Sequence, residues 1–196
     1  MPSAELSALL DLMRSLFLSG RTGVLILLLV TAALIDSRFH RIPNWLVVAG
    51  ALYAVTYNTL VPPWPNSTIL FPLAGMALGL VLFLPLYVLR AMGAGDVKLL
   101  AMVGAFVGAS DVWRMALASL LVGGILAIIY VLMKGTAQRL YRNLFTLFHS
   151  SIISTLNGSA PNLRVSTSES AGRLPYGVAI ALGSIGFLIL RQFGFI

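Results

Sequence analysis

Six long apolar segments, separated by short polar turns, dominate the pattern of the chain. Runs of Leu, Val, Ile, Ala and Phe with few charges predict membrane-spanning helices, because a helix that crosses a bilayer needs about 20 apolar residues. The fourth segment is short by that measure. The pattern predicts an all-α, polytopic membrane protein with about six transmembrane helices, at 22–36, 43–61, 68–89, 97–110, 112–133 and 175–190.

Two further segments have an amphipathic pattern instead of a uniformly apolar one. Residues 1–19 place leucines at helical spacing with Glu5, Asp11 and Arg14 between them, which predicts a helix that lies in the membrane interface or leads into the first span. Residues 134–174 begin with a second helix of this kind and continue into a Ser/Asn/Gly-rich loop. We expect a single membrane-embedded domain, 1–196, that carries these two accessory segments.

The composition limits the possible classes of function. The chain is 59% hydrophobic and only 10% charged, whereas a soluble domain carries about 25% charged residues, so a soluble protein is disfavoured. The absence of Cys excludes disulfides, a Cys nucleophile and Cys-ligated metals, and two His argue against a His-rich metal site. We therefore expect no metal and no cofactor.

The positive charges follow the ends of the apolar segments. The net charge of +7 is therefore explained by cations that set the orientation of the chain in the membrane and contact anionic lipids. No nucleic-acid partner is expected. With six crossings, nine cations fall on one side, which the positive-inside rule makes cytoplasmic, and both termini are predicted outside. The nine are Arg38, Arg41, Arg90, Lys98, Lys134, Arg139, Arg142, Arg164 and Arg173; the opposite side has Arg14, Arg21, Arg114 and Arg191.

Two acidic residues gain significance from this topology. Asp36 ends the first span as the chain enters the cytoplasm and Asp96 opens the fourth as the chain leaves, so both are expected at the same depth. Carboxylates at membrane depth are costly and usually functional. Two that converge cannot both ionise easily, so one can act as a base on water while the other, protonated, polarises a carbonyl. The alternative is interfacial ion pairs, Asp36 with Arg38 or Arg41 and Asp96 with Lys98.

Three short motifs resemble those of the type IV prepilin peptidases, a family of intramembrane aspartic peptidases. Residues 93–98, GAGDVK, match the G-x-G-D-x-K motif, and residues 35–44, IDSRFHRIPN, match the segment of the other aspartate. Residues 174–177, LPYG, resemble a Pro-(Tyr/Phe)-Gly motif that opens a late span. The order and the span positions agree over residues 35–183, which is most of the chain.

The resemblance implies roles for individual residues. Asp36 and Asp96 would be the catalytic pair of an aspartic endopeptidase, and Gly93 and Gly95 would permit the backbone conformation that places Asp96. Lys98 would have a structural or electrostatic role. The remaining motif residues would line the site or simply mark helix ends, and these are Pro43, Asn44, Pro175, Tyr176 and Gly177.

The resemblance also implies a substrate, a place and a branch of the family. The expected activity is removal of the basic leader from prepilin or pseudopilin precursors at the cytoplasmic face of a bacterial inner membrane, in pilus biogenesis. Large members carry a Cys-x-x-Cys domain and also N-methylate the product. This chain has no Cys, so it resembles the short Tad/Flp/Cpa-type branch, and no methyltransferase activity is expected. Pilus assembly proteins are a further class of expected partner.

Two other functions fit the same residues. A proton- or cation-coupled transporter would use Asp36 and Asp96 as relay sites, but it predicts carboxylates nearer the bilayer middle and internal repeat symmetry. A non-catalytic subunit of the pilus assembly machinery would tolerate the loss of either Asp.

Overall fold

Every predicted span corresponds to a helix. The computed structural model describes residues 20–61, 68–89, 91–133 and 176–194, and this described part contains six α-helices and no strand. The all-α prediction is therefore confirmed. The predicted accessory segments 1–19 and 134–174 lie outside the described residues. The helices are α2 (Gly20–Phe39), α3 (Asn44–Leu60), α4 (Leu70–Val88), α5 (Ala94–Val107), α6 (Ala109–Met133) and α8 (Tyr176–Gln192).

The chain separates into two compact units. One consists of Met1–Gly123 with Pro175–Ile196, and the other is Gly124–Leu174. Within the described residues, the first unit holds α2 to α5, the beginning of α6 and all of α8. Every residue of the site described below belongs to this first unit, while the expectation of a single domain stays a prediction.

Among the described helices, three are long and apolar enough to cross a membrane. These are α2, α4 and the Ala109–Tyr130 part of α6, and α8 is a shorter apolar helix. Their outer faces expose large apolar side chains such as Leu27, Val81 and Leu121, each more than 60% exposed. Such faces are stable in lipid, where a helix satisfies its own backbone hydrogen bonds. The chain is thus a membrane protein.

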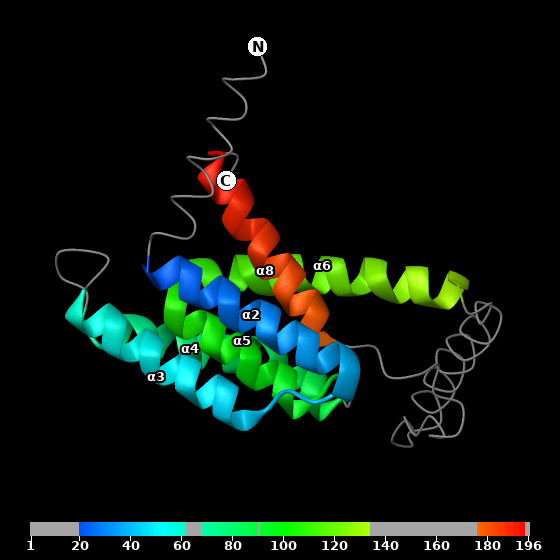
Figure 1. The fold of residues 1–196 in the computed structure, drawn as a ribbon, viewed down its shortest axis with the longest axis horizontal. Helices are drawn as coiled ribbons and strands as arrows, with labels where there is room; N and C mark the ends of the chain where they lie inside the picture. Colours follow the sequence, from blue (N-terminus) through cyan, green and yellow to red (C-terminus); the bar gives the residue numbers. More distant parts are fainter. Residues whose placement is uncertain (1–19, 62–67, 90, 134–175, 195–196) are drawn as a thin grey trace, which may run out of the picture. The chain divides into compact units, whose positions relative to one another are not determined.

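The short helix α5 is surrounded by its neighbours. Eleven of its 14 residues are buried, and α3, α4 and α8 all pack against it. Figure 1 shows α5 lying among α2, α3 and α4. At 1.5 Å per residue α5 is about 21 Å long, less than the hydrocarbon thickness. It can be short because it contacts protein on nearly all sides.

Glycines allow α4 and α5 to pack closely. A Cβ on Gly75 would lie 2.0 Å from the carbonyl oxygen of Gly104, and a Cβ on Gly104 would lie 2.1 Å from that of Gly75. Gly79 meets the backbone of Leu100 in the same way. Glycines four residues apart, at 75 and 79 in α4 and at 104 and 108 at the end of α5, are typical of closely packed membrane helices, and in the structure they lie at the contact between α4 and α5.

The boundary between α5 and α6 differs from the prediction. The sequence pattern extends the fourth span to residue 110 and begins the fifth at 112. In the structure α5 ends at Val107, because Gly108 has a φ of 78°, a left-handed conformation that ends a helix and favours glycine. The next helix begins at once, at Ala109. A single residue therefore forms the turn, with Phe71 packed against it.

Candidate active site

Four helix ends from distant parts of the sequence meet at one place. They are the C-terminal end of α2 and the N-terminal ends of α3, α5 and α8. Gly177 at the start of α8 contacts Asp36 near the end of α2, as Figure 1 shows for the two helices, and Lys98 of α5 contacts Asn44 of α3. Alternating helix directions predict only that these four ends share one face, and all three sequence motifs contribute residues to the contacts between them.

Asp36 lies one turn before the end of α2 and is only 5% exposed. Its Oδ2 accepts a hydrogen bond of 2.8 Å from the backbone N–H of Gly177. The helix ends just beyond it, where His40 adopts a left-handed φ of 52° and its N–H bonds to the Asp36 carbonyl. This turn directs the chain into α3, so the position of Asp36 is fixed both by its own helix and by α8.

Asp96 lies in the first turn of α5 and is 8% exposed. Its Oδ2 accepts a hydrogen bond of 3.0 Å from the N–H of Gly93, the residue that caps the helix. A carboxylate at the third helical position commonly bonds back to the cap in this way. Ile42, in the turn that follows the helix of Asp36, packs against Gly95, the neighbour of Asp96, so the structure places the two acids that topology predicts at one depth in the same region.

The two glycines beside Asp96 act differently from the expectation. Gly93 has φ −80° and ψ 156°, and Gly95 lies inside α5, so neither adopts a conformation reserved for glycine. The expectation that they permit a special backbone conformation was wrong. A Cβ on Gly95 would lie 3.2 Å from the Cβ of Ile42, so Gly95 permits close approach of the α2–α3 turn. Gly93 offers its N–H to Asp96.

Lys98 is not the partner of Asp96. Its Nζ donates a hydrogen bond of 3.0 Å to Oδ1 of Asn44, which joins the first turns of α5 and α3. Among the described residues, neither Asp36 nor Asp96 forms an ion pair, since the salt bridges there involve Asp111. The alternative of ion pairs with Arg38, Arg41 or Lys98 was therefore wrong in this part of the chain.

The remaining motif residues differ in how close they lie to the two aspartates. Pro43 caps α3 in an extended conformation, φ −65° and ψ 131°, so it marks the helix start as its position predicts. Gly177 lines the site directly, because a Cβ there would lie 2.8 Å from Asp36 Oδ2. Tyr176 begins α8 and packs against the apolar core. Pro175 lies outside the described residues.

The arrangement leaves one oxygen of each acid available. A backbone N–H holds Oδ2 of Asp36 and of Asp96, and Oδ1 of each has no hydrogen-bond partner among the described residues. Backbone donors from α8 and from the α4–α5 turn thus fix two buried carboxyl groups while leaving an edge of each for water or a carbonyl. Two such carboxyl groups can perform acid–base catalysis together.

Comparison with known families agrees with this geometry. The model of the type IV leader peptidase family matches residues 23–132, more than half of the chain and including both Asp36 and Asp96. The chain belongs to the type IV leader peptidase family. No curated protein and no solved structure matches the chain. Membership of the leader peptidase family indicates a peptidase function on this membrane-embedded fold.

In this leader peptidase, the role of Gly177 is clearer from the structure than from the sequence. The motif that ends in Gly177 could equally have marked a helix start, and it lies beyond the residues that the family model matches. The structure shows that its N–H supports Asp36 across 141 positions of sequence. In the sequence, the only indication of this role was that residue 177 is a glycine. The packing of α8 against α2 explains why a glycine is needed there, because it lets the backbone approach Asp36.

Proposed function

We propose that the protein is a two-aspartate leader peptidase that removes the basic leader from prepilin or pseudopilin precursors. Asp36 and Asp96 are the catalytic pair. The observation that carries the proposal is the convergence of two buried carboxyl groups from different helices, each held through one oxygen by a backbone N–H. The family match supports the same reaction class.

The proposed reaction needs neither a metal nor a covalent intermediate. One carboxylate removes a proton from a water molecule, whose oxygen attacks the scissile carbonyl carbon, while the other, protonated carboxyl donates a hydrogen bond to the carbonyl oxygen. The tetrahedral intermediate then collapses, the C–N bond breaks, and a carboxyl proton passes to the leaving amine. The N–H donors of Gly93 and Gly177 keep both carboxyl groups oriented through these proton transfers.

The membrane setting defines how a substrate reaches the pair. Asp36 and Asp96 are near helix ends and not at helix centres, so a peptide bond at the membrane surface can approach them. We propose that the precursor's apolar segment lies in the bilayer and its leader lies at the cytoplasmic face of a bacterial inner membrane. Both termini of the enzyme are then outside. Exposed Arg38 and Arg41 nearby oppose attraction of a basic leader by bulk charge.

We assign the protein to the short Tad/Flp/Cpa-type branch, with cleavage and no N-methylation, because the sequence lacks the Cys pairs of the larger members. Pilus assembly proteins are proposed as further partners.

The test is processing of a Tad/Flp-type pilin precursor co-expressed with this chain in a host without another prepilin peptidase. We expect a shorter pilin whose new N-terminus, measured by mass spectrometry, follows the basic leader and carries no methyl group. The matched control is the precursor expressed alone. A precursor that stays at full length while both proteins accumulate in the membrane contradicts the proposal, and is the result that a transporter or an assembly subunit predicts.

A further inference from the structure

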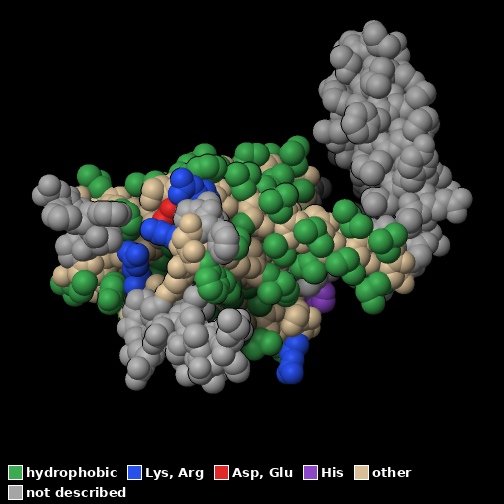
Figure 2. All heavy atoms as spheres, turned by 90° about the horizontal axis from the view of Figure 1, so that it is seen from above, with side chains coloured by type: hydrophobic (Ala, Val, Ile, Leu, Met, Phe, Trp, Pro, Cys, Tyr) green, Lys and Arg blue, Asp and Glu red, His purple; other side chains and the backbone are tan. Residues whose placement is uncertain are grey.

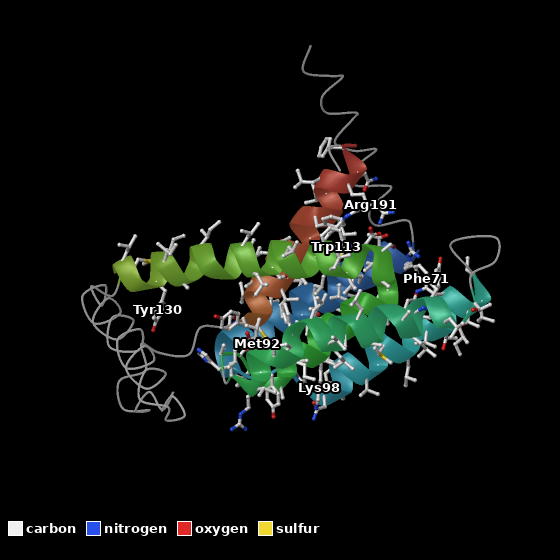
Figure 3. The ribbon with its side chains drawn as sticks, turned by 180° about the vertical axis from the view of Figure 1, so that it is seen from behind. Phe71, Met92, Lys98, Trp113, Tyr130 and Arg191 are labelled. Atoms are coloured by element: carbon white, nitrogen blue, oxygen red, sulfur yellow. The ribbon has the colours of Figure 1, made fainter. Side chains whose placement is uncertain are left out.

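A cavity lies at the other end of the helices from the aspartate pair. It has a volume of about 260 Å³ and is formed where the start of α2, the end of α5 and the end of α8 meet. Figure 3 shows Arg191, at this end of α8, well apart from Lys98 near the aspartate pair. The lining residues are Arg21, Thr22, Leu25, Phe106, Val107, Leu188, Arg191 and Gln192.

The polar part of the cavity carries an excess of positive charge. Asp111 already pairs with Arg191 and, at 3.4 Å, with Arg114, so among the described residues of this region three arginines stand against one acid. Arg21 has no ion pair among the residues that the structure describes. Within the described parts of the chain its guanidinium donates only to the amide oxygen of Asn58, at 3.3 Å. Figure 2 shows Lys and Arg side chains gathered around an acidic one on an otherwise largely hydrophobic face.

Asn58 fixes this arrangement from inside the protein. It is fully buried, and its amide nitrogen donates to the carbonyl oxygen of Ala105 at 2.8 Å, at the end of α5. Its oxygen is therefore directed to Arg21. Because a neutral amide satisfies only one donor of a guanidinium that has five, the other donors remain available to an anion. Arg191 likewise keeps donors beyond those that reach Asp111.

Aromatic residues place this end at a membrane–water interface. The hydroxyl of Tyr53 donates to the carbonyl of Gly20, and Tyr53 stacks on Tyr57, whose ring lies beside Gly20. Trp113, 43% exposed, carries the Arg114 guanidinium over its ring. Tyr and Trp gather at the depth of lipid headgroups. The cavity thus combines two arginines and two polar side chains with an apolar wall of Leu25, Phe106, Val107 and Leu188.

From these observations we infer that the cavity binds the phosphate group of an anionic ligand, which at this depth is the headgroup of an anionic phospholipid. Arg21 and Arg191 bind the phosphate, since guanidinium groups bind phosphate through paired hydrogen bonds. Thr22 and Gln192 donate to the remaining oxygens or to the headgroup, and the apolar wall receives the first carbons of an acyl chain. This inference is independent of the proposed peptidase activity, because it involves neither Asp36 nor Asp96.

The test measures thermal unfolding of the full-length protein in a neutral detergent. Short-chain phosphatidylglycerol, short-chain phosphatidylcholine and inorganic phosphate are titrated separately into the wild type, Arg21→Gln, Arg21→Lys and Arg38→Gln. We expect phosphatidylglycerol to raise the melting temperature of the wild type, and Arg21→Gln to weaken its apparent affinity about tenfold or more. Arg21→Lys retains part of the effect. Arg38→Gln, which removes an exposed arginine at the other end of α2, leaves it unchanged.

The three ligands separate the sources of the phosphate. Stabilisation by phosphatidylglycerol beyond that by inorganic phosphate, lost in Arg21→Gln, supports a lipid site. If inorganic phosphate stabilises the protein as much as phosphatidylglycerol does, and Arg21→Gln abolishes both effects, the anion site is supported and its ligand is free phosphate. Equal effects of phosphatidylglycerol and phosphatidylcholine, or an effect that Arg21→Gln and Arg38→Gln reduce equally, overturns the inference. Absence of any stabilisation in the wild type overturns it too.

Discussion

The replacement Gly177→Ala tests how the site holds Asp36. The added Cβ would lie 2.8 Å from Oδ2, 3.0 Å from Cβ and 3.1 Å from Cγ of Asp36. Carbon contacts are optimal at about 3.5–4.0 Å, so Asp36 and α8 must separate by about 0.5–1 Å. The hydrogen bond from the Gly177 N–H, now 2.8 Å, would lengthen accordingly.

We expect Gly177→Ala to lower the rate of cleavage more than it lowers the stability of the fold. A misplacement of about 1 Å at a catalytic group can cost about 100-fold in rate, so we expect kcat for precursor cleavage to fall by about that factor. The assay is cleavage per mole of folded enzyme in membranes, with the melting temperature measured on the same preparation.

Gly186→Ala is the matched control for Gly177→Ala. It is on the same helix, and a Cβ there would meet no atom within 4 Å. We expect the wild-type rate and a slightly higher stability, by about 0.5–1 kcal/mol, because Ala favours a helix more than Gly. A wild-type rate in Gly177→Ala would refute the conclusion that the Gly177 N–H positions Asp36 for catalysis, and an equal loss in Gly186→Ala would do the same.

Three further predictions follow from the contacts around the site. Gly93→Ala should lower the cleavage rate only slightly, because its Cβ would lie 3.4 Å from Asp96 Oδ2 and the backbone suits any residue; a loss as large as that of Gly177→Ala contradicts this. Lys98→Met and Asn44→Ala should be non-additive in thermal unfolding, with a coupling of about 0.5–1 kcal/mol, and additivity would show that their hydrogen bond is not formed. Gly104→Ala should destabilise the protein by about 3 kcal/mol through overpacking against Gly75, and unchanged stability would disprove the close contact.

The common depth of Asp36 and Asp96 was predictable because it depends on few assumptions. Apolar segments fix the number of crossings, and each crossing reverses direction, so the end of the first span and the start of the fourth must share a face. Both residues also stand out as acids in a chain with only six. Depth in the membrane can thus be predicted without knowing how the helices pack.

Lateral packing could not be predicted in the same way. Whether Lys98 contacts Asp96 or Asn44, and whether Gly177 contacts Asp36, depends on which helices are neighbours and on their rotation. Gly95 is typical: the family resemblance implied that it permits a particular backbone conformation, whereas the structure shows an ordinary helix packed closely against Ile42. The α5–α6 boundary was missed because Gly108 lies within an uninterrupted apolar pattern.

Asn58 shows what the pattern could have revealed. A polar amide inside an apolar span is costly in a membrane unless its hydrogen bonds are satisfied, and this alone marks it for attention. Its partners, the end of α5 and Arg21, follow only from the fold.

The most direct test of the central claim is the cleavage rate of Asp36→Asn and of Asp96→Asn. Asn preserves the size of each side chain and can still accept the N–H of Gly177 or Gly93 through its amide oxygen, so the fold should persist. General acid–base catalysis contributes about 10²–10⁴-fold, and we predict that each variant loses at least that much activity while accumulating in the membrane. The control, Asp111→Asn, removes a buried acid at the other end of the helices and should still cleave. Persistent processing by either Asp36→Asn or Asp96→Asn would contradict the two-aspartate mechanism.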